Sequence, residues 1–275
     1  MTLQLAPTIL QEGSRELALA GAALLLAGLA LTPICVILAR RWIPKSQVFF
    51  ARWRFFHAGL IAALLVLGSS LAPRVVSALA GKSVLPDALS GLLASVLALG
   101  TCSLVILYFA ARQDPEGIRS LGLRMAGSLR AAGVALTCYV LLVPGLIGVS
   151  MAWPWLLERL GGKFEPQRIA VALGELVGSQ RALAALLAIV VLPFFEELVF
   201  RGFLQPLLVQ NLGDRGGMFL TSLVFAVLHG DSAFLPIFAL ALLLGSLMLR
   251  TQRLSAPYLV HAAHNALAFM VLAAA

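Results

Sequence analysis

Long apolar runs recur along the whole chain, and each is close to the length that crosses a lipid bilayer as a helix. The first extends from Leu17 to Leu38 and the last from Ala256 to Ala275, with polar breaks between successive runs. About 20 apolar residues span the hydrocarbon core as an α-helix, whose backbone groups bond within the segment. We therefore expect an all-α fold, a polytopic bundle of transmembrane helices.

The composition supports this fold class and excludes others. Of the 275 residues, 61% are hydrophobic and 12% are charged, whereas soluble domains are about 45–50% apolar and about 25% charged. Such a chain has too little polar surface for a soluble particle, and disorder needs low hydrophobicity and high charge. The formal net charge of +8 does not indicate nucleic-acid binding, because the basic residues fall between apolar runs, as in cytoplasmic loops of membrane proteins. The expected partner is the lipid bilayer, with no nucleic acid.

The runs and their breaks predict about eight spans, within a range of six to eight. The polar stretch from Pro154 to Arg181 is expected to be amphipathic rather than spanning. The predicted spans are Leu17–Leu38, Phe55–Leu71 extending toward Ala80, Ala88–Ala110, Ala131–Trp153, Ala182–Leu208, Met218–His229, Phe234–Leu249 and Ala256–Ala275.

Ionisable residues are unevenly distributed among these spans. The first 180 residues place none near the middle of a span, whereas the last hundred place several. Charged groups inside a membrane are costly and mark functional sites. We therefore expect residues 1–181 to form a membrane-spanning scaffold and residues 182–275 to hold the catalytic core, within one membrane domain.

Two adjacent carboxylates, Glu196 and Glu197, lie in the otherwise apolar run from Ala182 to Leu208. On a helix Glu197 faces Arg201 four residues later, so the arginine can compensate its charge. Glu196 points about 100° away and has no such partner. A carboxylate without a counter-ion, partly removed from water, suits general-base catalysis. The alternative, an interfacial Glu–Arg pair at a helix end, leaves Glu196 unexplained.

A histidine, His229, closes the apolar segment that begins near Met218. Alone, such a histidine is more often a packing residue. By helical rise, however, it lies roughly 18 Å from the polar break at residues 211–217, and Glu196 lies roughly 22 Å from the same break. Antiparallel neighbouring helices would therefore bring both residues to a similar depth.

The last run contains a second polar group, His261, His264 and Asn265. His261 and Asn265 share a helix face at a spacing of four, and His264 also neighbours His261. These side chains could simply join helices through hydrogen bonds. By helical rise, His261 lies only about 12 Å from the break at Arg253, so it reaches the depth of Glu196 only if a helix tilts or a loop is uneven.

Taken together, the three groups resemble the motifs of the CPBP family, the CAAX prenyl endopeptidase and bacteriocin-processing (Abi) intramembrane proteases. The resembling residues are Glu196-Glu197-x-x-x-Arg201, Phe225-x-x-x-His229 and His261-x-x-x-Asn265. All three motifs occur in order within apolar segments, over about Pro193–Asn265, and no motif position departs from the pattern. The motif spacing selects His261 and Asn265 over His264.

The resemblance implies a multi-pass intramembrane endopeptidase of the cell membrane, expected to be a bacterial plasma membrane. Its substrate would be a membrane-associated protein or peptide, either CAAX-type and prenylated or bacteriocin-like. Glu196 would activate a water molecule with help from His229, and His261 and Asn265 would stabilise the oxyanion. Glu197, Arg201 and Phe225 would support the site.

Two further questions stay open at the level of sequence. Glu196, His229 and His261 are also a valid ligand set for a catalytic zinc ion, although they lack the compact H-E-x-x-H pattern, and we favour the metal-independent version. The alternative functions are an ion- or proton-coupled transporter and a non-catalytic scaffold or bacteriocin-immunity protein. A transporter would show inverted repeats, and an idle relative would have lost a motif residue.

Overall fold

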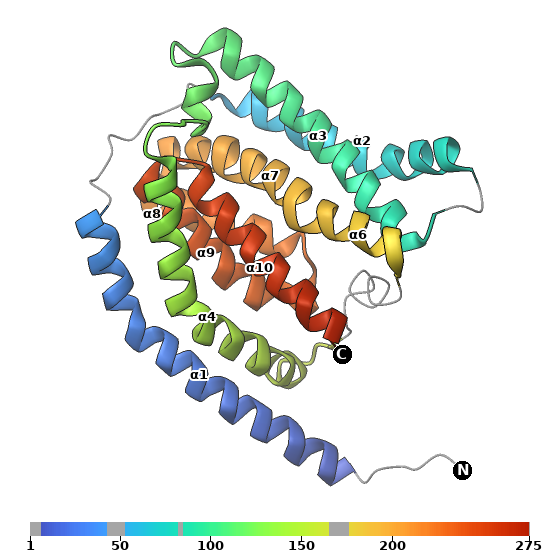
Figure 1. Cartoon of the computed structure of the whole chain (residues 1–275), viewed down its shortest axis with the longest axis vertical. Helices are drawn as coiled ribbons and strands as arrows, with labels where there is room; N and C mark the ends of the chain where they lie inside the picture. The colour runs from blue at the N-terminus through green and yellow to red at the C-terminus, as the bar shows by residue number, and fades with distance from the viewer. Residues whose placement is uncertain (1–6, 43–52, 82–84, 165–175, 275) are drawn as a thin grey trace.

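The computed structural model describes residues 7–42, 53–81, 85–164 and 176–274, and these residues form helices and no strands (Figure 1). The predicted all-α fold is therefore confirmed. The α-helices are α1 (Pro7–Trp42), α2 (Phe55–Ala80), α3 (Asp87–Gln113), α4 (Ser128–Arg159), α6 (Gly178–Leu186), α7 (Leu192–Glu197), α8 (Gln205–Val227), α9 (Phe234–Thr251) and α10 (Ser255–Ala274). Shorter turns are the 3-10 segments η1 (Gly117–Leu121) and η4 (Asp231–Ala233) and the π-helical segments η2 (Leu187–Val191) and η3 (Leu198–Leu204).

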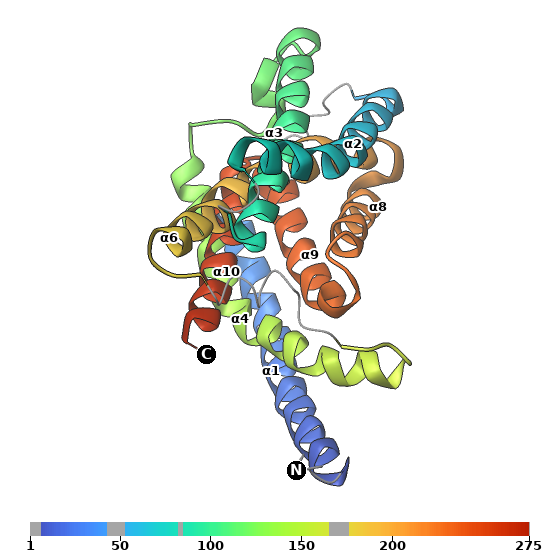
Figure 2. The same ribbon diagram turned by 90° about the vertical axis from the view of Figure 1, so that its right-hand side faces the viewer.

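Two helix pairs enclose the C-terminal helices. The pair α1 and α4 contacts α9 and α10 through α4, and the pair α2 and α3 contacts the stretch from α6 to η3 through α3. Figures 1 and 2 show α6 to α10 between these two pairs. The helices that carry the three motifs therefore form the centre of the molecule.

Glycines allow α1 and α4 to pack backbone to backbone. A Cβ atom added to Gly28 would lie 2.4 Å from the Cα of Gly145, and one added to Gly148 would lie 2.4 Å from the carbonyl oxygen of Gly21. Small residues at such crossings let membrane helices approach closely, where van der Waals contact replaces the missing hydrophobic driving force.

Six helical stretches of the described residues are long and apolar enough to cross a membrane, consistent with the predicted six to eight. The second span does extend to Ala80, as α2. The fourth ends later than predicted, because α4 continues through Pro154 to Arg159. The predicted amphipathic segment therefore begins after this helix, and its residues 165–175 lie outside the described residues.

The predicted break between the fifth and sixth spans lies inside α8. Gly213 has a φ of +72° and a non-helical ψ of 171°, which interrupts the helix. After this residue the chain folds back, so that a Cβ atom on Gly217 would lie only 2.4 Å from the backbone nitrogen of Val209. A left-handed φ and this close approach both favour glycine, and the break separates Glu196 from His229 as the sequence indicated.

Two π-helical turns flank the pair of carboxylates. In η2 the N–H of Leu192 donates to the carbonyl of Leu187, and in η3 the N–H of Gln205 donates to the carbonyl of Phe200, each across five residues. A proline follows each donor, Pro193 and Pro206. Because proline lacks an N–H and its ring clashes with the carbonyl four residues earlier, widening of the preceding turn relieves the clash while the helix continues.

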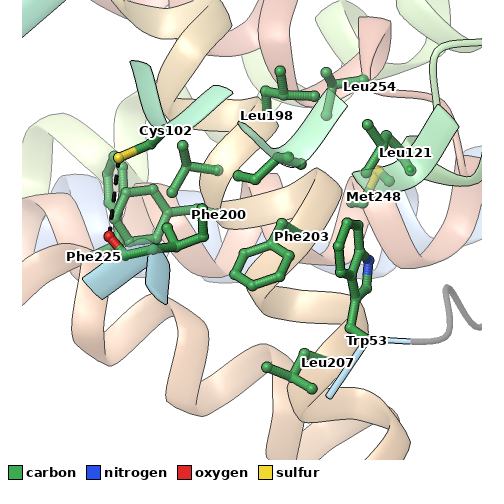
Figure 3. Packing of buried hydrophobic residues seen from close by; sticks show 14 of the residues in the cluster. Trp53, Cys102, Leu121, Leu198, Phe200, Phe203, Leu207, Phe225, Met248 and Leu254 are labelled. Carbon is green, nitrogen blue, oxygen red and sulfur yellow. Dashed lines mark hydrogen bonds between the residues drawn. The ribbon is translucent and has the colours of Figure 1, made fainter. Parts of the chain in front are cut away.

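The core packs around η3. Figure 3 shows Phe203 edge-on to Trp53, with ring centroids 4.7 Å apart, and Phe200 edge-on to Phe225 at 4.9 Å. Cys102 of α3 also lies in this cluster, its thiol 3.9 Å from the carbonyl oxygen of Ile61. The core thereby fixes η3, which follows the two carboxylates along the chain, against α2, α3 and α8.

Candidate active site

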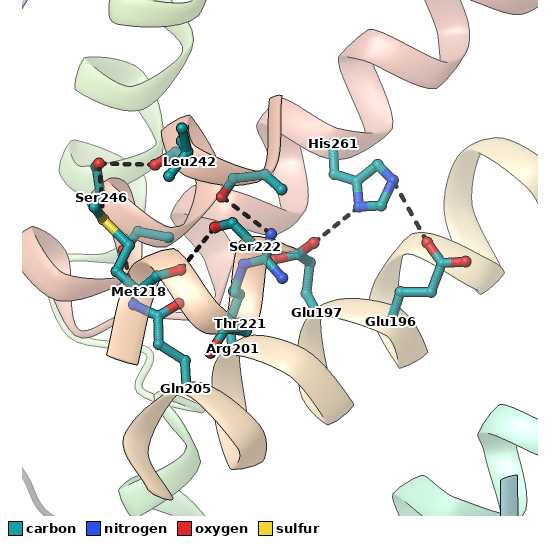
Figure 4. Close-up of polar contacts among 12 residues, drawn as sticks. Glu196, Glu197, Arg201, Gln205, Met218, Thr221, Ser222, Leu242, Ser246 and His261 are labelled. Carbon is teal, nitrogen blue, oxygen red and sulfur yellow. Dashed lines mark hydrogen bonds and ion pairs between the residues drawn. The ribbon is translucent and has the colours of Figure 1, made fainter. Parts of the chain in front are cut away.

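Two of the three motifs come into direct contact, with His261 of α10 between the two carboxylates (Figure 4). Its Nδ1 lies 2.9 Å from Oε1 of Glu197, and its Nε2 lies 3.5 Å from Oε2 of Glu196. The packing of α10 against η2 and α7 produces this contact. His261 therefore reaches the depth of Glu196, which rise per residue alone did not predict.

Glu197 and Arg201 form a fully buried ion pair, as their spacing predicted. The Nε of Arg201 lies 3.6 Å from Oε2 of Glu197, and neither side chain is exposed. Arg201 also donates from Nη2 to the backbone carbonyl of Ala241, 3.2 Å away. Glu197 is thus held between a guanidinium and an imidazole, and it has no access to the site's cavity because its side chain is completely covered.

Glu196 differs from its neighbour because it lies at the wall of a cavity of about 470 Å³. Its side chain is 19% exposed, against 0% for Glu197. Only one of the two carboxylates can therefore reach a water molecule and a substrate. Arg201 pairs with Glu197, as predicted. Glu196 also has a basic neighbour, because it faces the ring of His261.

His229 lines the same cavity as Glu196. Its Nδ1 lies 2.7 Å from the backbone carbonyl oxygen of Phe225. A carbonyl can only accept, so Nδ1 carries the hydrogen, and Nε2 of the neutral ring is the acceptor. An imidazole in this tautomer can accept a hydrogen bond from a water molecule in the cavity.

Phe225 connects the members of the site. It is fully buried, and its ring centroid lies 4.6 Å from the ring of His229 and 5.8 Å from that of His261. The Cζ of Arg201 lies 5.0 Å from the same centroid, within range of a cation–π interaction. The phenyl ring thereby contacts the buried guanidinium and both histidines.

The remaining polar residues of α10 have different partners. Asn265 donates from Nδ2 to the backbone carbonyl of Ala188 in η2, 2.9 Å away. His264 points toward α4, where its Nδ1 lies 3.3 Å from the hydroxyl of Tyr139. Of the two histidines in this motif, the structure therefore brings His261 to the carboxylates, in agreement with the motif spacing.

The zinc alternative requires Glu196, His229 and His261 to converge on one point. Among the described residues, no three His, Cys, Asp or Glu side chains are grouped closely enough to hold a metal ion. The two nitrogens of His261 face the two carboxylates instead of a common centre shared with His229. The donor set in this arrangement does not fit a three-ligand zinc site.

The walls of the cavity come mainly from a part of the chain where the sequence offered no signal. Helices α2 and α3 contribute nine lining residues, which are small or apolar, and their two serines bond to carbonyls of their own helices. A lining of this kind has no polar motif to detect. The lining residues from these helices are Leu65, Val66, Ser69, Pro73, Gly91, Ala94, Ser95, Ala98 and Leu99.

The chain is similar to a known peptidase family over the segment that forms this site. Residues 178–267 match the family model described as type II CAAX prenyl endopeptidase Rce1-like. This match confirms the resemblance that the three motifs indicated. No curated protein and no solved structure matches the chain.

Proposed function

We propose that this chain, whose residues 178–267 match the Rce1-like CAAX endopeptidase family model, hydrolyses a peptide bond of a prenylated, membrane-associated protein. The observation that carries the proposal is that Glu196 and His229 line one apolar cavity. The ring of His261 contacts the carboxylate of Glu196, with Nε2 at 3.5 Å from Oε2. The family match also favours a peptidase over a transporter or an idle scaffold. The proposal includes a catalytic core over residues 182–275 and a bacterial plasma membrane as its location.

In the proposed reaction, Glu196 takes a proton from a water molecule in the cavity, and His229 accepts a second hydrogen bond from that water. The water oxygen forms a bond to the carbonyl carbon of the scissile peptide, and the carbonyl oxygen becomes an oxyanion. The C–N bond then breaks as the leaving nitrogen takes the proton from Glu196. A free amine and a carboxylic acid are released, and the acid then gives up its remaining proton to water.

The remaining residues balance the buried charges of the site and stabilise the oxyanion. Glu197 and Arg201 neutralise each other and fix the ring of His261 through its Nδ1. Both nitrogens of His261 can donate only when the ring is protonated, and a donor at Nε2 beside the scissile carbonyl would stabilise the oxyanion. Asn265 has a second hydrogen on Nδ2, since one is donated to Ala188, and that hydrogen is the oxyanion donor that the resemblance implies.

The cavity supports a lipid-bearing substrate. Its volume of about 470 Å³ lies in the range of small-molecule sites, and its walls on α2 and α3 are small or apolar. An isoprenoid chain would bury apolar surface there while its attached peptide reaches Glu196. An unmodified bacteriocin-like leader would leave this wall uncovered.

The test uses the purified full-length protein in phosphatidylcholine vesicles and two peptides that differ only in a farnesyl group on the cysteine. Mass spectrometry of the products should show cleavage of the farnesylated peptide, at a kcat/KM at least about tenfold above that of the unmodified peptide. The Glu196→Gln protein controls for contaminating peptidases. Equal cleavage of both peptides would contradict the prenyl preference, and cleavage of neither would contradict the proposed substrate class.

The metal-independent mechanism predicts full activity in a preparation stripped of metal. We expect less than stoichiometric zinc in the purified protein by elemental analysis, and unchanged kcat after dialysis against a chelator. His261→Ala should lose activity without any change in metal content. Stoichiometric zinc that is lost in His261→Ala, together with activity that a chelator abolishes and zinc restores, would make the protein a zinc enzyme.

A further inference from the structure

One backbone carbonyl near the site has lost both of its helical donors. In a regular helix the carbonyl of Ala188 would accept from the N–H of Leu192, but that N–H donates to Leu187 in the π-helical turn. In a continued π-helical turn it would accept from residue 193, which is Pro193 and has no N–H. The carbonyl of Ala188, inside a membrane-spanning helix, therefore receives no hydrogen bond from the N–H of residue 192 or from residue 193.

Asn265 of α10 supplies the missing donor, with its Nδ2 at 2.9 Å from the oxygen of Ala188. An unsatisfied backbone group in the hydrocarbon region is strongly unfavourable, and side chains of neighbouring helices commonly satisfy groups that proline leaves free. The bond is thus a specific link between α10 and the helix that carries Glu196 and Glu197.

The position of the link on α10 connects it to the site. Asn265 lies one turn after His261 on the same helix face, and Ala188 lies eight residues before Glu196. Sliding or rotation of α10 against η2 would break the bond to Ala188. The same movement would change the separations of 2.9 Å and 3.5 Å between the ring of His261 and the two carboxylates.

We infer that Asn265 is a positioning residue: by bonding to the carbonyl that Pro193 leaves without a donor, it fixes His261 between Glu196 and Glu197. This role goes beyond the oxyanion role that the resemblance implies. The activity measurements that test this positioning role rest on the proposed function, but the stability measurements do not.

The two roles of Asn265 differ in their dependence on Pro193. The Pro193→Ala substitution restores an N–H at residue 193, which either continues the π-helical turn to Ala188 or lets the regular helix re-form, with Leu192 donating to Ala188. In both cases the carbonyl no longer needs Asn265. An oxyanion donor acts on the substrate, so its loss cannot be repaired by an N–H at residue 193.

The experiment is a double-mutant cycle of wild type, Pro193→Ala, Asn265→Leu and the double variant, in full-length protein in detergent. Displacement of a catalytic group by about 1 Å can cost about 10²-fold, and loss of an oxyanion donor costs about 10²–10³-fold, so Asn265→Leu should lower kcat by at least about 10²-fold with little change in KM. We expect Pro193→Ala alone to stay within about threefold of wild type. The kcat of the double variant should be at least about tenfold higher than that of Asn265→Leu. A difference of this size matches the interaction energies measured between residues of one hydrogen-bond network.

Tyr258 provides a matched control on the same helix. Its hydroxyl donates to the carbonyl of Val190 in the same π-helical segment, 3.3 Å away. The helical donors to Val190 would be residues 194 and 195, both of which have an N–H. Any effect of Tyr258→Phe should therefore be independent of Pro193→Ala, whereas the effect of Asn265→Leu should depend on it.

Two readouts separate positioning from general damage. The pH profile of kcat/KM should shift in Asn265→Leu, because the distances from the ring of His261 to the two carboxylates change, and should return toward wild type in the double variant. The melting temperature of Asn265→Leu should fall by several degrees and recover in the double variant. This second measurement holds even if the proposed peptidase activity is wrong.

Equal kcat and equal melting temperature in Asn265→Leu and the double variant would overturn the inference and leave an oxyanion role alone. Wild-type kcat in Asn265→Leu would overturn it as well. If Asn265→Leu cannot be purified, recovery of folded double variant supports the inference, and failure of both variants contradicts it.

Discussion

Glu196→Gln should abolish peptidase activity while leaving the protein folded in the membrane. The substitution keeps the size and shape of the side chain and removes its ability to accept the proton of the attacking water. Loss of a general base lowers the rate by about 10²–10⁴-fold. The measurement is kcat/KM on the farnesylated peptide, with the melting temperature in detergent as a check on folding.

A matched substitution separates this effect from any general loss of carboxylate charge. Glu116 is 48% exposed and pairs with Arg124 outside the site, so Glu116→Gln should retain wild-type activity. Glu196→Gln within about tenfold of wild type would rule out Glu196 as the general base. Glu197 is unsuited to replace it, because its side chain is fully buried.

The sequence predicted the motif residues and the approximate helices for a clear physical reason. A bilayer requires long apolar runs with internal hydrogen bonds, so the spans are visible without any tertiary information. Ionisable residues stand out against these runs, which is why Glu196, His229 and His261 were identified as candidates. The pairing of Glu197 with Arg201 was also predictable, since a spacing of four is local to one helix.

Other features of the site depend on tertiary packing and on irregular backbone. The contact between His261 and Glu196 follows from how α10 lies against η2 and α7, which rise per residue does not describe. The cavity walls on α2 and α3 are apolar and look like any lipid-facing helix in the sequence. The acceptor on Ala188 arises from Pro193 and a widened turn, a combination that a regular helical wheel omits.

Arg201→Ala should destabilise the protein strongly as well as inactivate it. Arg201 and Glu197 are both completely buried and are 3.6 Å apart, so removing the guanidinium leaves the carboxylate beside only the imidazole of His261. Breaking a buried ion pair from one side costs about 3–5 kcal/mol. We expect a fall in melting temperature on the order of 10 °C in detergent, with activity lost in parallel.

Two further variants identify the cause of that loss. Adding Glu197→Gln to Arg201→Ala removes the uncompensated charge, so the double variant should regain part of the melting temperature but not the activity. Arg124→Ala breaks the partly exposed pair with Glu116, and exposed pairs contribute only about 0–1 kcal/mol, so this control should melt near wild type. An Arg201→Ala protein with wild-type melting and full activity would show that the buried pair neither stabilises the helix nor orients His261.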